Sequence, residues 1–171
     1  MEIVCPKCDH KRSIDDDKIP NKRVIIHCKV CDHKFPLQRA RKIGVMISKG
    51  GVGKTTTSVN LAAGLALEGY KVLLIDTDTQ GQASYMLGVK PEGGLTDLVT
   101  GDLEPDECIF KAREGLWLLA GGKSLASVKR LISQKSFGGE STLSEALAPI
   151  ENRFDFIVID ECHRSIYSVW R

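Results

Sequence analysis

Long hydrophobic runs are missing from this chain of 171 residues. No stretch approaches the roughly 18 consecutive apolar residues of a membrane-spanning helix. The opening residues, Met1-Glu2-Ile3-Val4-Cys5, also lack the charged start and the long apolar stretch of a secretory signal. These absences predict a protein with no membrane span and a cytoplasmic location.

A strong charge of one sign is absent as well, because the formal net charge is only +2. The charge is unevenly distributed: residues 1–42 hold 11 Lys and Arg against 6 Asp and Glu, and the remainder holds 13 against 16. We interpret this basic excess mostly as a solvated surface and not as a nucleic-acid site.

Two cysteine pairs stand out near the start of the chain. Cys5-x-x-Cys8 and Cys28-x-x-Cys31 are separated by 19 residues, which is the spacing of a structural zinc site. Four sulfurs complete a tetrahedron and leave no open position for catalysis. A redox pair or a disulfide is the less favoured alternative, because the chain shows no secretion signal.

The rest of this region is short. About 37 residues bury little core, so the metal would supply the folding energy. Residues 22–27 and 33–37 are predicted strands. Because four cysteines are available, the nearby His10, His27 and His33 are interpreted as surface residues or as hydrogen-bond donors around the metal ligands. The segment resembles the zinc-ribbon modules found at the front of some bacterial proteins. We predict a zinc ribbon over 1–37 and a linker over 38–42.

A glycine-rich segment at 48–57 lies between the apolar run 43–47 and a helix-like stretch at 59–67. This order predicts strand, phosphate loop and helix. Glycines leave backbone N–H groups open to a polyphosphate. The next two side chains, Lys54 and Thr55, suit the β- and γ-phosphates and a bridging Mg²⁺. A glycine-rich turn with exposed lysines is the alternative. The predicted nucleotide-binding residues are Lys49, Gly50, Gly51, Val52, Gly53, Lys54, Thr55 and Thr56.

The loop departs from the pattern G-x-x-x-x-G-K-[ST], because Ser48 occupies the first glycine position and Lys49 follows it. In this it resembles the deviant Walker A box of the ParA/MinD/Soj family of ATPases. That resemblance implies an α/β P-loop NTPase fold, with a mostly parallel sheet flanked by helices. It also implies that Lys49 reaches the phosphates of the partner in a nucleotide-sandwich dimer.

Carboxylates end two of the predicted strands. The apolar run 71–76 closes on Asp76-Thr77-Asp78, and residues 153–160 close on Asp160. The resemblance implies that Asp78 and Lys49 are catalytic, with Asp78 positioning the attacking water, and that Asp76 supports the Mg²⁺ shell. Asp160 ends a Walker B strand and would hold Mg²⁺ with Thr55. An acidic turn and a plain strand cap are the alternatives.

The other predicted elements are short helices at 82–88 and 94–101, a third strand at 116–120, and covering helices at 124–132 and 142–150. Residues 102–111 are predicted to form a polar connection. We assign 43–160 to the nucleotide-binding domain.

The end of the chain resembles a different family. From about Phe154, and above all in Asp160-Glu161-Cys162-His163, it is similar to motif II of DEAD/DEAH-type helicases and the motor subunit of type I restriction enzymes. We interpret 161–171 as a helicase-like tail on a truncated or recombined gene, with a sheet that lacks its later strands. An intact, longer reading frame would exclude this hypothesis.

The leading prediction is a ParA-like ATPase of the chromosome or plasmid partitioning type that uses ATP, Mg²⁺ and Zn²⁺. The resemblance implies an ATP-dependent homodimer, a ParB-like activator and non-specific DNA as partners. Two alternatives stay open: a helicase or restriction-motor fragment, and a non-catalytic zinc-ribbon adaptor that binds nucleotide. Whether ATP is turned over is left open by the sequence.

Overall fold

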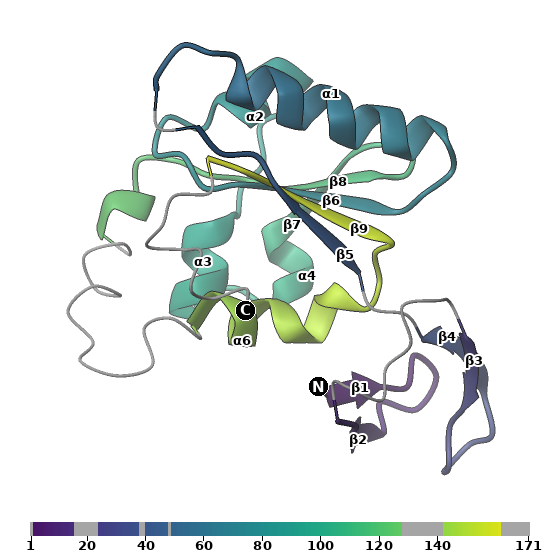
Figure 1. Cartoon of the computed structure of the whole chain (residues 1–171). Coiled ribbons are helices and arrows are strands. Elements are labelled where there is room, and N and C mark those ends of the chain that lie inside the picture. Colours follow the sequence, from purple (N-terminus) through teal and green to yellow (C-terminus); the bar gives the residue numbers. More distant parts are fainter. Residues whose placement is uncertain (1, 16–23, 38–39, 48, 128–141, 162–171) are drawn as a thin grey trace.

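The computed structural model describes residues 2–15, 24–37, 40–47, 49–127 and 142–161 (Figure 1). Within these ranges the chain forms two small antiparallel hairpins and one larger sheet that carries helices on both faces. No helix in the described part of the chain is long and apolar enough to cross a membrane.

The N-terminal module is built from two hairpins of similar design. β1 (Glu2–Val4) pairs with β2 (Lys11–Ser13), and β3 (Val24–His27) pairs with β4 (Lys34–Leu37). The second hairpin confirms the strands predicted at 22–27 and 33–37, whereas the first hairpin was not predicted. A small core fills the space between them and consists of Ile3, Cys5, Cys28, Phe35 and Leu37.

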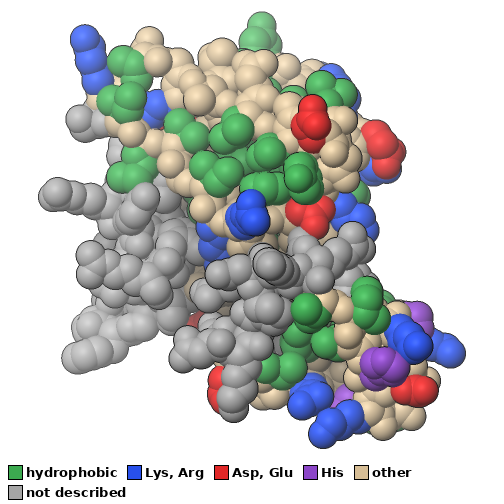
Figure 2. All heavy atoms as spheres, turned by 45° about the vertical axis from the view of Figure 1, so that its right-hand side comes forward, with side chains coloured by type: hydrophobic (Ala, Val, Ile, Leu, Met, Phe, Trp, Pro, Cys, Tyr) green, Lys and Arg blue, Asp and Glu red, His purple; other side chains and the backbone are tan. Residues whose placement is uncertain are grey.

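The turns of the two hairpins repeat one geometry. Cys5 and Cys28 each donate a backbone N–H to the carbonyl five residues later, at 3.0 and 2.9 Å. Asp9 and Asp32 close the turns, and both adopt a φ of 53°. Figure 2 shows this module with basic and histidine side chains at its surface, next to exposed apolar ones. Ile25 and Val30 are exposed apolar residues of the module.

The central sheet has the strand order β5-β9-β6-β8-β7, in which all neighbours are parallel except β8 and β7. This confirms the predicted mostly parallel sheet. β5, which leads into the glycine-rich loop, lies at one edge of the described sheet. The strands are β5 (Arg41–Gly44), β6 (Val72–Asp76), β7 (Ile109–Arg113), β8 (Leu116–Leu119) and β9 (Phe156–Asp160).

Helices cover both faces of this sheet (Figure 1). Val72 and Leu74 of β6 pack with α1 and α2, whereas Leu73 and Ile75 pack with α3 and α6. A strand buried on both faces reads as a continuous apolar run, which is why β6 was visible in the sequence. The helices are α1 (Lys54–Leu67), α2 (Gln82–Leu87), α3 (Leu95–Thr100), α4 (Pro105–Cys108) and α6 (Thr142–Glu151).

Some predicted boundaries differ from those observed. β5 begins at Arg41, so two residues of the predicted linker 38–42 belong to the first strand of the sheet. The connection predicted over 102–111 instead contains α4 and the start of β7. The helix begins after Glu104 because Pro105 starts it and Glu107 bonds back to the Glu104 N–H at 3.0 Å. Most of the helix predicted at 124–132, and the predicted tail beyond Glu161, lie outside the described residues.

Candidate functional site

The glycine-rich loop joins β5 to the N-terminus of α1. Gly51 and Gly53 have φ values of 70° and 85°, a region that side chains with a Cβ rarely adopt. A Cβ added at Gly50, Gly51 or Gly53 would meet nothing within 4 Å, so the space around the loop is open. The first N–H groups of α1 lack helical acceptors and face this space with the positive end of the helix dipole. The arrangement fits an anion such as a phosphate.

The two lysines of the loop lie in different environments. Lys54 is buried, and its Nζ donates to the carbonyl of Lys49 at 2.9 Å and pairs with Glu161 Oε1 at 2.9 Å. Lys49 itself is exposed at the mouth of the loop, as are Val52 and Thr56, whereas Thr55 is half-buried.

Two carboxylates meet at the neighbouring strand ends. β6 and β9 are adjacent and parallel, and their register aligns Asp76 with Asp160. Ser58 of α1 donates to Asp160 Oδ1 at 2.9 Å, and Asp160 Oδ2 is buried with no hydrogen-bond partner among the described residues. A buried carboxylate oxygen without a partner calls for a cation, and Mg²⁺ prefers oxygen ligands. The residues present therefore fit Mg²⁺ bound beside a phosphate.

Asp76 organises the loop that follows β6. Its Oδ1 accepts from the Asp78 N–H at 2.9 Å, and its Oδ2 accepts from the Ala83 N–H at 3.0 Å. Burial, with a smaller contribution from Asp160, raises the pKa of Asp76 to about 6. Asp78 is half-buried, and its Oδ1 accepts from the Gln80 N–H at 3.1 Å. The structure thus brings both predicted acids of this segment to the sheet edge that holds Asp160.

Three residues of this region were not identified as site residues from the sequence. Ser58 orients Asp160, and Glu161 pairs with Lys54, although the sequence left the direction of Glu161 open. Gly121 permits a close approach, because a Cβ there would lie 2.5 Å from the Asp78 carbonyl oxygen and 2.7 Å from that of Asp76. A glycine pair directly after a strand was the one sequence signal for this contact.

The four predicted zinc ligands come together at the tips of the two hairpins. The sulfurs of Cys5, Cys8, Cys28 and Cys31 all lie within 4.8 Å of one another. The Cys5–Cys31 and Cys8–Cys28 Sγ distances are 3.7 and 3.6 Å. Tetrahedral Zn²⁺ with Zn–S bonds of about 2.3 Å requires an S–S separation of about 3.8 Å, so the cluster fits zinc.

Backbone N–H groups favour the thiolate form of one of these cysteines, Cys28. Cys31 and Val30 lower the pKa of Cys28 to about 6, and the Val30 N–H lies 3.4 Å from the Cys28 sulfur. A thiolate is the form that binds zinc. The histidines have other contacts, since His27 Nδ1 lies 3.2 Å from Asp32 Oδ1 and His33 stacks on Phe35.

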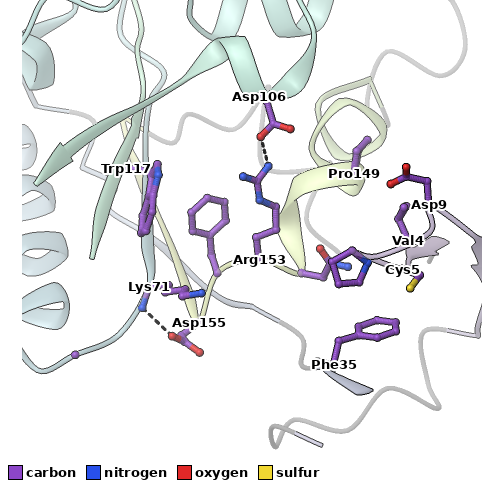
Figure 3. A pocket seen from close by; sticks show the side chains of 14 residues that line it. Val4, Cys5, Asp9, Phe35, Lys71, Asp106, Trp117, Pro149, Arg153 and Asp155 are labelled. Atoms are coloured by element: carbon purple, nitrogen blue, oxygen red, sulfur yellow. Dashed lines mark hydrogen bonds and ion pairs between the residues drawn. The ribbon is translucent and has the colours of Figure 1, made fainter. Parts of the chain in front are cut away.

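A cavity of about 630 Å³ lies between this module and the larger domain (Figure 3). Phe35 lines it on one side, and Trp117 and Arg153 line it on the other. Arg153 forms an ion pair with Asp106 at its rim. Lys71 and Asp155, which also line it, precede β6 and β9. The cavity therefore lies where β6 and β9 begin, at the other end of the strands from Asp76 and Asp160.

Comparison with known families gives two matches that together span most of the chain. A family model for a zinc-ribbon domain matches residues 1–36, and a family model for an AAA domain matches residues 40–166.

Relatives with assigned names are similar over about seven tenths of the chain. The chromosome-partitioning ATPase Soj of Thermus thermophilus is 38% identical over 122 residues, which covers 71% of this chain and 46% of Soj. Cobyrinic acid a,c-diamide synthase of Mycobacterium smegmatis, solved with ADP and magnesium, has a TM-score of 0.65 and 35% identity. It is matched over 71% of this chain and 50% of its own.

A Cyanothece McdA–ATP complex has a TM-score of 0.67 and 26% identity, with 77% of this chain and 52% of that chain covered. This chain spans about half the length of the relatives it matches. The AAA-domain match, the deviant phosphate loop and the parallel sheet agree with one another. The chain therefore belongs to the ParA/MinD/Soj family of P-loop ATPases and carries a zinc ribbon at its N-terminus.

Proposed function

We propose that this chain binds ATP with Mg²⁺ at residues 49–56 and uses it as a dimerisation switch of the partitioning type. The observation that carries the proposal is the contrast between the two loop lysines. Lys54 is buried behind the loop, where it serves its own subunit, whereas Lys49 is exposed at the mouth and accessible to a second subunit.

Each residue of the site has a proposed task. The N–H groups of Gly51, Gly53 and Lys54 bind phosphate oxygens, and the Lys54 ammonium neutralises their charge. Thr55 and Asp160 would hold Mg²⁺, which offsets the negative charge that gathers on the phosphates.

The remaining roles concern hydrolysis. Asp76 fixes the loop that carries Asp78, and Asp78 orients the attacking water. Lys49 reaches the phosphates bound by the partner subunit, so that a dimer forms with ATP and dissociates after hydrolysis. The named relatives support this proposal: one is described as a chromosome-partitioning ATPase, and two were solved with adenine nucleotides.

The zinc ribbon and the cellular context are part of the proposal. Cys5, Cys8, Cys28 and Cys31 would hold one Zn²⁺ that stabilises residues 1–37, joined by a short linker to a nucleotide domain at 41–160 that begins with β5. A cytoplasmic location, a ParB-like activator and non-specific DNA follow from the family proposal.

Light scattering coupled to size exclusion tests the switch. The zinc-loaded chain is expected to be a dimer in Mg²⁺-ATP and a monomer in Mg²⁺-ADP. Lys49→Ala should reduce dimerisation more than nucleotide affinity, whereas Lys71→Ala, which removes an exposed charge before β6 at the other end of the sheet, should change neither. A monomer in both nucleotides would contradict the switch, and equal loss of binding and dimerisation would make Lys49 an ordinary phosphate contact.

One observation favours a second candidate, a DNA-stimulated motor. Glu161 directly follows Asp160, as the glutamate of helicase motif II follows its aspartate. Its carboxylate lies 2.9 Å from the ammonium group of Lys54 in the phosphate loop. This candidate predicts ATP hydrolysis that rises with DNA and is abolished in Glu161→Gln. Nucleotide binding without turnover, at any DNA concentration, would instead favour the adaptor.

A further inference from the structure

Glu161 is held in an unusual backbone conformation directly after β9. Its φ of 53° lies in the left-handed region, which is uncommon for residues other than glycine, asparagine and aspartate. The hydroxyl of Thr77, a buried residue, lies within hydrogen-bond distance of two carbonyls, that of Asp160 at 2.8 Å and that of Glu161 at 2.9 Å. The β6–β9 junction therefore fixes the backbone of Glu161 next to the phosphate loop.

The Glu161 carboxylate lies against the lysine of the loop. The Lys54 Nζ–Glu161 Oε1 distance is 2.9 Å, and the two side chains are only 6% and 16% exposed. Salt and water screen a pair at this depth much less than a surface pair. A second ammonium hydrogen of Lys54 is directed to the Lys49 carbonyl at 2.9 Å. A polyphosphate that uses Lys54 must displace Glu161 or lie beside its negative charge.

The charges around the loop add to the repulsion between Glu161 and a bound polyphosphate. Four carboxyl groups gather at this edge of the sheet (Asp76, Asp78, Asp160 and Glu161), whereas the loop offers two ammonium groups (Lys49 and Lys54). A free nucleotide brings about three to four further negative charges, so Coulomb repulsion opposes its binding. Mg²⁺ carries two positive charges to the same place and can satisfy the buried Asp160 oxygen. The carboxylate of Glu161 therefore opposes the free nucleotide more than its magnesium complex.

We infer that Glu161 is a specificity-determining residue of the phosphate site, which makes the loop select magnesium-complexed nucleotide over free nucleotide. This inference rests on the proposed nucleotide binding, and it names the residue that distinguishes the magnesium complex from the free nucleotide. Removing the charge of Glu161 relieves the repulsion of the phosphates that only Mg²⁺ otherwise offsets.

The test is a titration of the full, zinc-loaded chain with a fluorescent ADP analogue, with Mg²⁺ and without it. Divalent cations are removed from the buffer by ion exchange, because a soluble chelator would also extract zinc from the ribbon. Glu161→Gln should bind the magnesium-free analogue about tenfold more tightly than the unaltered chain, equivalent to about 1.4 kcal/mol. Its affinity for the magnesium complex should change by less than about twofold, because Mg²⁺ already offsets the charge.

Two further variants control this titration. Glu68→Gln removes the same charge from an exposed site just after the last turn of α1 and should leave both affinities unchanged. Glu161→Asn is also uncharged and suits the left-handed backbone, so it should reproduce Glu161→Gln even if the glutamine variant folds poorly.

The outcomes separate this inference from the proposed function. Equal tightening with and without Mg²⁺, or weaker binding of the magnesium complex in Glu161→Gln, would overturn the inference and keep nucleotide binding. An absence of binding by the unaltered chain and by every variant in both buffers would overturn the inference together with the proposed function.

Discussion

The hydroxyl of Ser58 reaches one oxygen of Asp160 at 2.9 Å and leaves the other oxygen buried and without a partner among the described residues. A serine hydroxyl has one hydrogen to donate, and the carbonyl of Lys54 also lies within reach at 3.1 Å. A carboxylate is the stronger acceptor, so the hydrogen goes to Asp160. The second turn of α1 thereby sets which way the Asp160 carboxylate points.

Ser58→Ala is expected to weaken the response to Mg²⁺. Loss of one hydrogen bond to a carboxylate costs about 1.5–3 kcal/mol, so the Mg²⁺ concentration for half-maximal nucleotide binding should rise by about tenfold or more. Thr57→Ala is the matched control, because the Thr57 hydroxyl donates to the Gly53 carbonyl at 2.9 Å and is exposed. An equal shift in both variants would mean that Ser58 stabilises the helix and does not orient Asp160.

Zinc removal is expected to unfold the N-terminal module and leave the larger core folded. The unaltered chain should contain one zinc per chain by elemental analysis, and Cys28→Ser should lose it. Cys108→Ala should keep its zinc, because Cys108 is buried beside α3 and α6 in the other domain. Full zinc occupancy in Cys28→Ser would contradict the four-cysteine site.

Two adjacent glycines should respond differently to the same substitution. Gly121→Ala places a Cβ 2.5 Å from the carbonyl oxygen of Asp78, so backbone must move, at a cost of about 1–3 kcal/mol. Gly122→Ala meets nothing within 4 Å and should be near neutral. Urea denaturation of both variants measures the difference in their free energies of unfolding. Equal stabilities would show that the backbone of Asp76–Asp78 moves at little cost.

Cys108 predicts a pH effect at alkaline pH. Burial, helped by nearby carboxylates, raises the pKa of this thiol from 9.0 to about 11. The unfolded chain therefore ionises it first, so its contribution to stability is present below pH 9 and is lost as the pH rises towards 11. The stability of the unaltered chain relative to Cys108→Ala should fall between those two values in denaturant titrations. A constant difference would contradict the shift.

Much of the local chemistry could be predicted from the sequence because it depends on short spacings. Short spacings indicate a metal site at the pairs Cys5/Cys8 and Cys28/Cys31. A short run from Gly50 to Thr55 likewise indicates a phosphate loop. The buried strand β6 was equally visible, because its residues are apolar on both faces. The antiparallel β7 was not, since its exposed Phe110 and Lys111 obscure an alternating pattern.

The contacts that assemble the site were beyond the sequence because they join distant positions. Ser58 and Asp160 are 102 residues apart, and their contact depends on β9 lying next to β6 under α1. The direction of Glu161 depends on a left-handed φ that its residue type does not favour. The order of strands in the sheet determines that Ser58 and Asp160 are neighbours.

That strand order also has a consequence for biosynthesis. β9, the last described strand, lies between β5 and β6, so the sheet stays divided until residues 156–160 have left the ribosome. β5 is synthesised more than a hundred residues before β9, so it cannot pair with β9 until that strand has been made. The two hairpins of the ribbon instead pair strands that are close in the sequence. Local contacts form quickly and distant ones slowly. During translation, the metal-binding module can be complete while the phosphate loop is still attached to an unpaired strand.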